Sequence, residues 1–376
     1  MTMRLRAIIW VLIIAGFIFG YAGFVFPGQT AILETPRQGT FQFQRLHIFF
    51  FNLVCGGTVL LYFTQARQKI SWQVLIFLIG SLAFSIAALF NLYLAASIIC
   101  LILTFVVENV RVGKFSLFPI EFFKKSVPLS DKFHQAALLC LSLALLICAG
   151  VMINTQYLHL INNTYLILDD FFLGFSFPIS LVTFAVIFSM TRDTHRPLLP
   201  ILGVASFWIV TVGVVIFFVL IILAIWIAEL ITSIVLLLDV LLLYYLFRVG
   251  SLGRAGDRRF LTSGMVFLIT TGITGVLLAL WSVLAPQDLQ GRVYLLQTHA
   301  YLSLYGWNLV GLTAIIHFVD FPKRLDQTPI ILLHWITVVL LAPLGSVYPL
   351  LAIIAIALFV FLTRALLLSQ PDPAVE

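Results

Sequence analysis

The sequence predicts an all-α, polytopic membrane protein with about twelve transmembrane helices. Of the 376 residues, 62% are hydrophobic and only 10% are charged, whereas about a quarter of the residues of a soluble domain are charged. Apolar stretches of about 20 residues, long enough to cross a bilayer core, recur along the whole chain. The basic residues fall on alternating connections between these stretches, as membrane topology requires.

We expect one membrane domain over residues 1–376, and we expect the first apolar stretch to be retained because no small-residue cleavage site follows it. The chain is apolar from Leu198 to Phe247, which is too long for one span. We place the break near Trp226 and Glu229, since Trp favours the headgroup level and a carboxylate avoids lipid. The expected spans are 6–26, 46–64, 71–89, 91–107, 133–154, 166–190, 198–221, 228–247, 260–284, 293–318, 329–345 and 347–369.

The distribution of basic residues predicts the orientation. With the N-terminus inside, only Arg37, Arg45 and Arg292 of the 21 basic residues lie on the outer side. The formal charge of +6 therefore reflects topology, and the protein needs no nucleic-acid partner. We expect an integral protein of a bacterial cytoplasmic membrane, in contact with the lipid bilayer and with both termini in the cytoplasm. The inner basic residues are Arg4, Arg6, Arg67, Lys69, Arg111, Lys114, Lys124, Lys125, Lys132, Arg192, Arg196, Arg248, Arg254, Arg258, Arg259, Lys323, Arg324 and Arg364.

The longest inner connection, residues 108–132, contains an amphipathic stretch. Residues 115–123 are mostly apolar, and Lys124 and Lys125 follow them directly. Apolar residues next to lysines are typical of a segment that lies on a membrane surface.

Two histidines inside the spans are the main functional candidates, because ionisable residues in lipid are costly. His47 begins the second span and His299 lies about two turns into the tenth, so both lie in the outer third of the membrane. Two neutral imidazoles from facing helices complete the coordination of a b-type haem iron. Arg45 and Arg292 lie near them and suit the haem propionates, since Arg pairs with carboxylates. The alternative is that both histidines only cap helix ends.

The sequence around both histidines resembles helices two and ten of haem-copper oxidase subunit I, in the cbb-type and nitric oxide reductase branch. Residues 45–57, RLHIFFFNLVCGG, place a histidine near the outer end and paired glycines after it. Residues 298–307, THAYLSLYGW, resemble the tenth helix, which carries H-x-H and then Gly-Trp. The resemblance implies a bundle like that of subunit I, haem b as cofactor, and electron transfer within a respiratory-type membrane complex. It also implies other subunits, a cytochrome or a quinol as electron partners.

The chain departs from that family at the copper site. The family binds copper through histidines on helices six and seven, but spans six and seven of this chain contain no histidine. We therefore expect no copper, and no reduction of oxygen or nitric oxide at a binuclear centre.

A second departure concerns the tenth span. Alignment on the Gly-Trp pair gives His299 the position of the high-spin haem ligand and puts Tyr301 at the position of the low-spin ligand. Residues two apart on a helix point about 200° apart, so His299 need not face His47. Either the helix is rotated and one haem lies between His47 and His299, or His299 binds a separate five-coordinate haem. We favour the single haem, because two histidines at equal depth need only one cofactor.

Other ionisable residues have two interpretations each. His317 and His334 both lie at the inner side, where they either bind a second haem or act as polar interfacial residues. Asp239, near the middle of span eight, either relays protons or is a neutral acid hydrogen-bonded between helices. We expect His134 and His195, beside charged residues at the inner ends of spans five and six, and His159, in an outer loop, to be solvated interfacial histidines.

Two other functions fit twelve spans. Residues 250–259 resemble the basic loop motif of major facilitator transporters, but residues 65–69 lack its repeat, and the connection 191–197 is shorter than the central loop of that family. The other alternative is a haem-free structural subunit of a membrane complex.

Overall fold

The computed structural model describes residues 1–25, 43–65, 70–161, 163–190, 198–250, 258–285, 287–319 and 321–370. Within these ranges the chain is helical and contains no strand. Ten of the helices there are long and apolar enough to cross a membrane. The protein is therefore an integral membrane protein built as a helical bundle.

The helices join into twelve rods along the described ranges, because some of them continue directly into the next. Most rods are α-helical, and four contain π-helical segments, which are named η here. The rods are α1 (Met3–Val25); α2 (Phe43–Ile48), η1 (Phe49–Gly57) and α3 (Thr58–Gln65); α4 (Trp72–Leu89); α5 (Tyr93–Lys114); α6 (Leu129–Ile153) and η3 (Asn154–Leu158); α7 (Thr164–Met190); α8 (Leu198–Ile222); α9 (Trp226–Gly250); α10 (Arg259–Leu284); α11 (Leu289–Tyr301), η4 (Leu302–Asn308) and α12 (Leu309–Ile316); α13 (Thr328–Trp335), η6 (Ile336–Leu341) and α14 (Ala342–Gly345); and α15 (Pro349–Leu367).

A tight turn divides the long apolar run of residues 198–247. Helix α8 ends at Ile222 and α9 begins at Trp226. Ala224 between them has a φ of 54°, a left-handed conformation that reverses the chain direction. The side chain of Asn163 donates a hydrogen bond to the carbonyl of Ile222 at 2.7 Å, which satisfies one of the free carbonyls at the end of α8.

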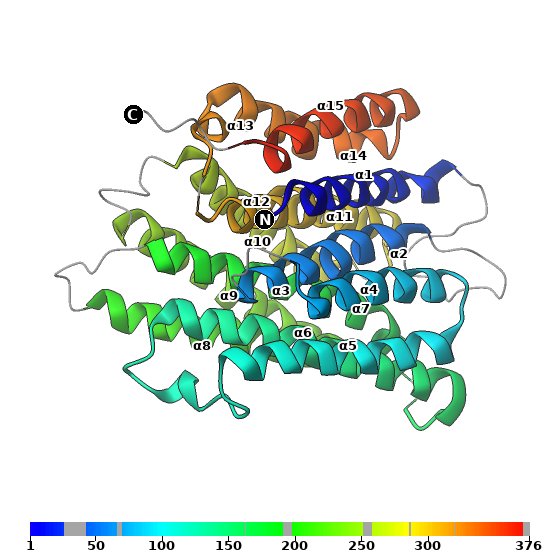
Figure 1. Ribbon diagram of the computed structural model, residues 1–376. Coiled ribbons are helices and arrows are strands. Elements are labelled where there is room, and N and C mark those ends of the chain that lie inside the picture. The colour runs from blue at the N-terminus through cyan, green and yellow to red at the C-terminus, as the bar shows by residue number, and fades with distance from the viewer. Residues whose placement is uncertain are drawn as a thin grey trace.

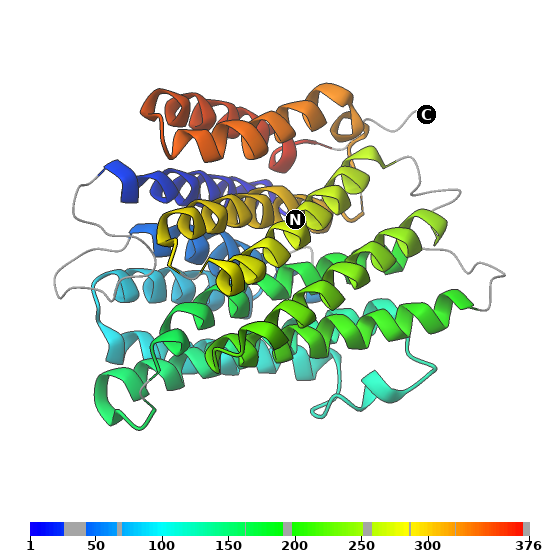
Figure 2. The same ribbon diagram turned by 180° about the vertical axis from the view of Figure 1, so that it is seen from behind.

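The rods lie side by side with their axes in roughly the same direction (Figure 1). Helices α13, α14 and α15 form one edge of the bundle, and α5, α6 and α8 form the opposite edge. Helices α1, α11 and α12 lie between these edges in both views (Figures 1 and 2).

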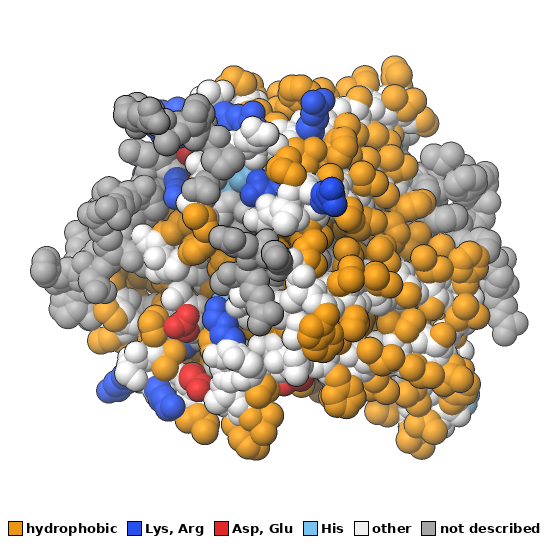
Figure 3. All heavy atoms as spheres, viewed as in Figure 1, with side chains coloured by type: hydrophobic (Ala, Val, Ile, Leu, Met, Phe, Trp, Pro, Cys, Tyr) orange, Lys and Arg blue, Asp and Glu red, His pale blue; other side chains and the backbone are white. Residues whose placement is uncertain are grey.

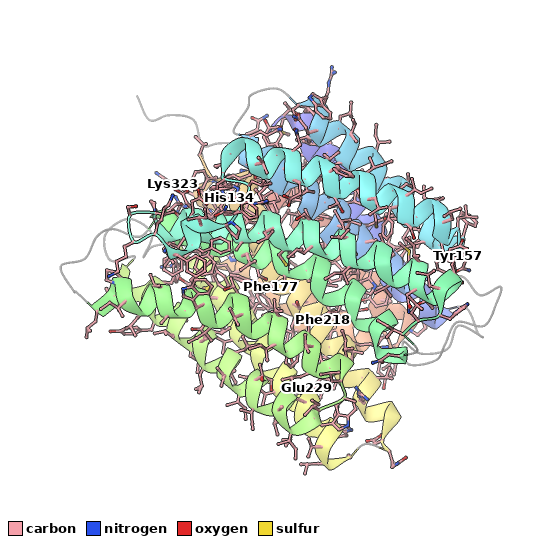
Figure 4. All side chains as sticks on the ribbon, turned by 90° about the horizontal axis from the view of Figure 1, so that it is seen from below. His134, Tyr157, Phe177, Phe218, Glu229 and Lys323 are labelled. Atoms are coloured by element: carbon pink, nitrogen blue, oxygen red, sulfur yellow. The ribbon has the colours of Figure 1, made fainter. Side chains whose placement is uncertain are left out.

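Charged side chains divide the bundle into two ends. Lys, Arg, Asp and Glu lie at the left and in the middle of the view in Figure 3, whereas the described side chains toward the right are mostly hydrophobic. Figure 4 places His134 and Lys323 at one end of the bundle and Tyr157 at the other. We call the first the charge-rich end and the second the charge-poor end. The start of α1 and the residues after α15 lie together, because the guanidinium of Arg6 donates to the carbonyl of Ser369 at 3.1 Å.

Candidate functional site

A cavity of about 420 Å³ lies among α7, α8, α9, α10 and the α11–η4 rod, and it reaches α1 and α2. Its volume falls within the range of roughly 300–1,000 Å³ that small-molecule and cofactor sites occupy. Along α9 its lining runs from Trp226, at the charge-poor end, to Val240. That stretch is about 21 Å long, so the cavity extends past the middle of the helix. Most of its lining is apolar, and polar side chains occur at separate points.

His299 lies on α11 with its ring against α10. Its Nδ1 lies 3.0 Å from the hydroxyl oxygen of Thr274, and a Cβ at Gly275 would lie 3.4 Å from its Cε1. The Thr274 hydroxyl also lies within hydrogen-bond distance of the carbonyls of Thr271, at 2.9 Å, and Thr270, at 3.2 Å. When it donates its one hydrogen to either carbonyl, it accepts a hydrogen bond from Nδ1–H of His299. In that tautomer the lone pair is on Nε2, where imidazole can bind a metal.

His47 lines the same cavity from α2. Its Nδ1 is buried without a hydrogen-bond partner among the described residues, and it lies 3.7 Å from the place of a Cβ on Gly20 of α1. The residue as a whole is partly exposed, so the exposed part of His47 lies away from that nitrogen. A buried polar atom without a partner is costly and is typical of functional positions.

The cavity therefore brings two of the predicted ligands into one space. His47 packs against α1 and His299 packs against α10, so the two imidazoles approach from different helices. Both imidazoles therefore border one cavity of cofactor size, and imidazole is a side chain that can bind a metal.

Arginine and glutamate side chains line the cavity near the charge-poor end. Arg292 is one of them, and its guanidinium carbon lies 6.0 Å from the centre of the Trp226 ring. Glu229 is another, on the first turn of α9. The side chain of Arg45 lies outside the described part of the chain. Of the two predicted arginines, the structure therefore places Arg292 at the cavity.

Tyr301 faces a different helix from His299. Its ring centre lies 6.0 Å from that of Tyr21 and 6.2 Å from that of Phe17, both on α1. His299 packs against α10, as expected for residues two apart on a helix. Tyr301 also lies 6.0 Å from Tyr305, so it belongs to an aromatic cluster between α1 and η4 and lines the α1 side of the cavity.

Each histidine is followed by a π-helical segment. Segment η1 begins two residues after His47, and η4 begins three residues after His299. In a π-helix each N–H bonds to the carbonyl five residues earlier, a geometry that is rare and frequently found at functional sites. These segments could not be predicted from the sequence, because their apolar residues also suit an ordinary α-helix.

Two buried amides join the π-helical segments along the cavity wall. The side chain of Asn308 in η4 donates to Asn52 Oδ1 in η1 at 3.2 Å. Asn52 donates to the hydroxyl of Ser176 on α7. Ser180, also on α7, donates to Asn308 Oδ1 at 3.3 Å and accepts from the Trp307 indole N–H at 2.8 Å. Sequence reasoning missed this network, although polar amides within apolar spans are a signal for it.

His317 and His334 do not line the cavity, and each is engaged elsewhere. Nε2 of His317 donates to the carbonyl of Leu366 at 2.8 Å, and its Nδ1 lies 3.4 Å from the guanidinium of Arg6. Nε2 of His334 donates to the carbonyl of Tyr305 at 2.6 Å. Both side chains are buried. These bonds tie neighbouring rods together, and Nδ1 of His334 is buried without a hydrogen-bond partner among the described residues. A second haem between His317 and His334 stays a prediction.

Asp239 lies in α9, buried against α8. Its Oδ2 accepts a hydrogen bond from the hydroxyl of Ser206 at 2.9 Å. A carboxyl accepts this bond in either protonation state, so the bond does not distinguish the two interpretations of Asp239. The neighbouring residue Val240 lines the cavity. A proton relay through Asp239 stays a prediction.

The expectation that His134 is solvated is wrong. The side chain is only 4% exposed. Its Nε2 lies 2.8 Å from the hydroxyl of Thr64, its Nδ1 lies 3.4 Å from the Lys114 ammonium, and its ring stacks on Phe63. Helices α3, α5 and α6 meet at His134 and exclude water from it. The charged residues next to His134 in the sequence did not indicate this burial. His195 lies outside the described residues.

Among the described residues, no three His, Cys, Asp or Glu side chains are placed to hold a metal ion together. A haem between two histidines needs only those two side chains, because the porphyrin supplies the other ligands. Comparison of the chain with protein-family models gives no match, and comparison with curated proteins gives no significant relative.

Proposed function

We propose that this protein carries electrons in the membrane through one b-type haem, with His47 and His299 as its axial ligands. The observation that carries the proposal is that these two imidazoles, distant in the sequence, line one largely apolar cavity of cofactor size. When bound, haem supplies a one-electron carrier whose potential depends on its ligands and its burial. The electron partners would be other subunits of a respiratory-type complex, a cytochrome or a quinol.

The protein's own residues have distinct roles in this proposal. Thr274 holds His299 in the tautomer that leaves Nε2 free. Arg292 lies at the charge-poor end of the cavity, where its guanidinium would pair with a propionate. We propose the same role for Arg45 on the basis of its position in the sequence. Tyr301 forms the wall of the cavity toward α1.

The proposed bundle is similar to that of haem-copper oxidase subunit I without its copper site. The support for this is the position of the two histidines in the second and tenth rods and the absence of histidine from spans six and seven. Reduction of oxygen at a copper centre is therefore not part of the proposed function.

A reduced-minus-oxidised absorption spectrum of the purified protein tests the proposal, together with elemental analysis. We expect the bands of haem b and iron in stoichiometric amount, with no copper. A colourless protein from haem-replete cells would overturn the redox function and favour a transporter or a structural subunit. Stoichiometric copper would instead overturn the part of the proposal that excludes a copper centre.

We further propose that the chain crosses the membrane twelve times, with the charge-rich end and both termini in the cytoplasm. The contact between Arg6 and Ser369 supports a common side for the start of α1 and the residues after α15, and the excess of basic residues supports the cytoplasm as that side. Reporter fusions at the termini should behave as cytoplasmic, and fusions in loops 155–165 and 286–292 should behave as external. A C-terminus on the outside would contradict this topology.

A further inference from the structure

The connection between α5 and α6 carries a cluster of exposed apolar side chains at the charge-rich end. Leu117, Phe118, Ile120 and Phe123 are 61%, 68%, 55% and 74% exposed. In Figure 1 this connection is the cyan to green segment at the lower left. Apolar side chains that are clustered and exposed mark a surface that interacts with an apolar partner. We call these four residues the apolar cluster.

Hydrogen bonds to the backbone hold the connection in this shape. The guanidinium of Arg111 donates to the carbonyl of Leu117 at 2.8 Å, and the ammonium of Lys132 donates to the carbonyl of Phe122 at 3.0 Å. The ring of Phe122 turns inward and lies 5.2 Å from that of Phe207 on α8. The outward direction of the apolar cluster is therefore fixed by the fold and does not depend on a partner.

The cluster is continuous with the lipid-facing surface of α8. The ring of Phe123 lies 5.2 Å from that of Trp208 in α8. Leu198 and Ile201 of the same helix are 66% and 64% exposed, as expected of side chains in contact with lipid. The partner that meets the apolar cluster is therefore the lipid around α8.

Positive charge lies directly beside the apolar cluster. Lys124 and Lys125 are both exposed. The nearest acid, Glu121, turns toward the protein, where it accepts hydrogen bonds from Ser116 and, at 3.3 Å, from Gln135. Hydrogen bonds, chiefly from Ser116, and the nearby charge of Lys124 lower the pKa of the Glu121 carboxyl, so this acid stays ionised and offsets part of the charge of Lys124. Two further acids lie in this region: Asp131, at the start of α6, and Glu108, which pairs with Arg111.

We propose that this connection is a site for anionic phospholipid, with the apolar cluster among the acyl chains and Lys124 and Lys125 at the headgroup phosphates. A lysine near an anionic membrane surface contributes a preference of about fivefold, so two lysines contribute roughly 25-fold. The site does not depend on the proposed haem.

The test uses the full chain with Phe123→Cys, labelled with a nitrobenzoxadiazole fluorophore in nanodiscs of phosphatidylcholine that contain increasing amounts of phosphatidylglycerol. We expect nitroxide-bearing lipid to quench the fluorophore in all nanodiscs, and phosphatidylglycerol bearing a nitroxide to quench it at a lower mole fraction than the phosphatidylcholine equivalent. In the Lys124→Gln/Lys125→Gln background the difference between the two lipids should be lost, whereas quenching by lipid should remain.

The matched control is Leu160→Cys, an exposed apolar position in the loop at the opposite end without an adjacent lysine. It should show no preference for phosphatidylglycerol. Background labelling is measured on the wild-type chain, because its four cysteines are free thiols that can also react with the fluorophore. Quenching of the probe at position 123 by iodide but not by lipid would show that the cluster faces water or another protein. Equal quenching by both lipids would show that the lysines select no headgroup. Either result would overturn the proposal.

Discussion

Replacement of either His47 or His299 with Ala is expected to abolish the low-spin haem signal of the purified protein. Both imidazoles line one cavity, and removal of either axial ligand leaves an iron that is at most five-coordinate. We expect the loss to be complete in both variants, and the bound haem to fall most strongly in His299→Ala, because Thr274 holds this ligand in place before haem binds. Absorption and electron paramagnetic resonance spectra measure the effect.

His159→Asn is the matched control for these two variants. His159 lies in an exposed turn with a φ of 51°, a conformation that Asn also adopts readily. Its replacement should leave the haem spectrum unchanged. If the wild-type haem is high-spin and only His299→Ala removes it, the single bridging haem is wrong and His299 binds a five-coordinate haem.

Replacement of Asn308 with Leu is expected to lower the free energy of unfolding by about 1–3 kcal/mol, the cost of leaving buried polar groups unsatisfied. Asn52 Oδ1 and the hydroxyl of Ser180 each lose a partner in this variant. Leu branches at Cγ as Asn does, so the change tests the hydrogen bonds more than the packing. Titration with sodium dodecyl sulfate in mixed micelles measures the difference.

The double variant Asn52→Leu/Asn308→Leu should be less destabilised than the sum of the single variants, because it removes both ends of the shared bond. Ser263→Ala is a control, since it removes a similar bond between Trp335 and Ser263, at 2.7 Å, away from the cavity. If the haem is bound as proposed, the Asn variants should also shift its spectrum, whereas Ser263→Ala should not. Additive effects of the two Asn replacements would contradict the coupling.

The membrane character of the fold could be predicted from the sequence because it depends on local composition. An apolar run of sufficient length crosses a bilayer whatever its neighbours are. The turn between α8 and α9 could also be predicted from the sequence, since Trp226 and Glu229 are residues that favour the membrane–water interface over the lipid core. The haem-copper oxidase-like arrangement of the helices stays a proposal, because it depends on contacts between distant segments.

The candidate functional site could be predicted from the sequence only in part. His47 and His299 could be selected because ionisable side chains within spans are rare. Their positions around the cavity depend on α1 and α10, which no local pattern specifies. The burial of His134 could not be predicted for the same reason: its neighbours Thr64 and Lys114 come from other helices.

The π-helical segments have a consequence for how the chain can change in length. A π-helical turn holds more residues than an α-helical turn, so loss of one residue within η1 can be absorbed by a return to α-helix. The α-helix that forms completes nearly the same rotation with one residue fewer, so the parts of the helix before and after η1 would keep their relative orientation and His47 would still face the cavity. A deletion within η4 would likewise leave His299 in place. Loss of a residue from an α-helical part, such as α3, has no extra residue to remove and would turn the parts on either side of it by about 100° relative to each other. The π-helical segments are therefore the places in these two helices where the chain can lose a residue without a change in the direction of the candidate ligands.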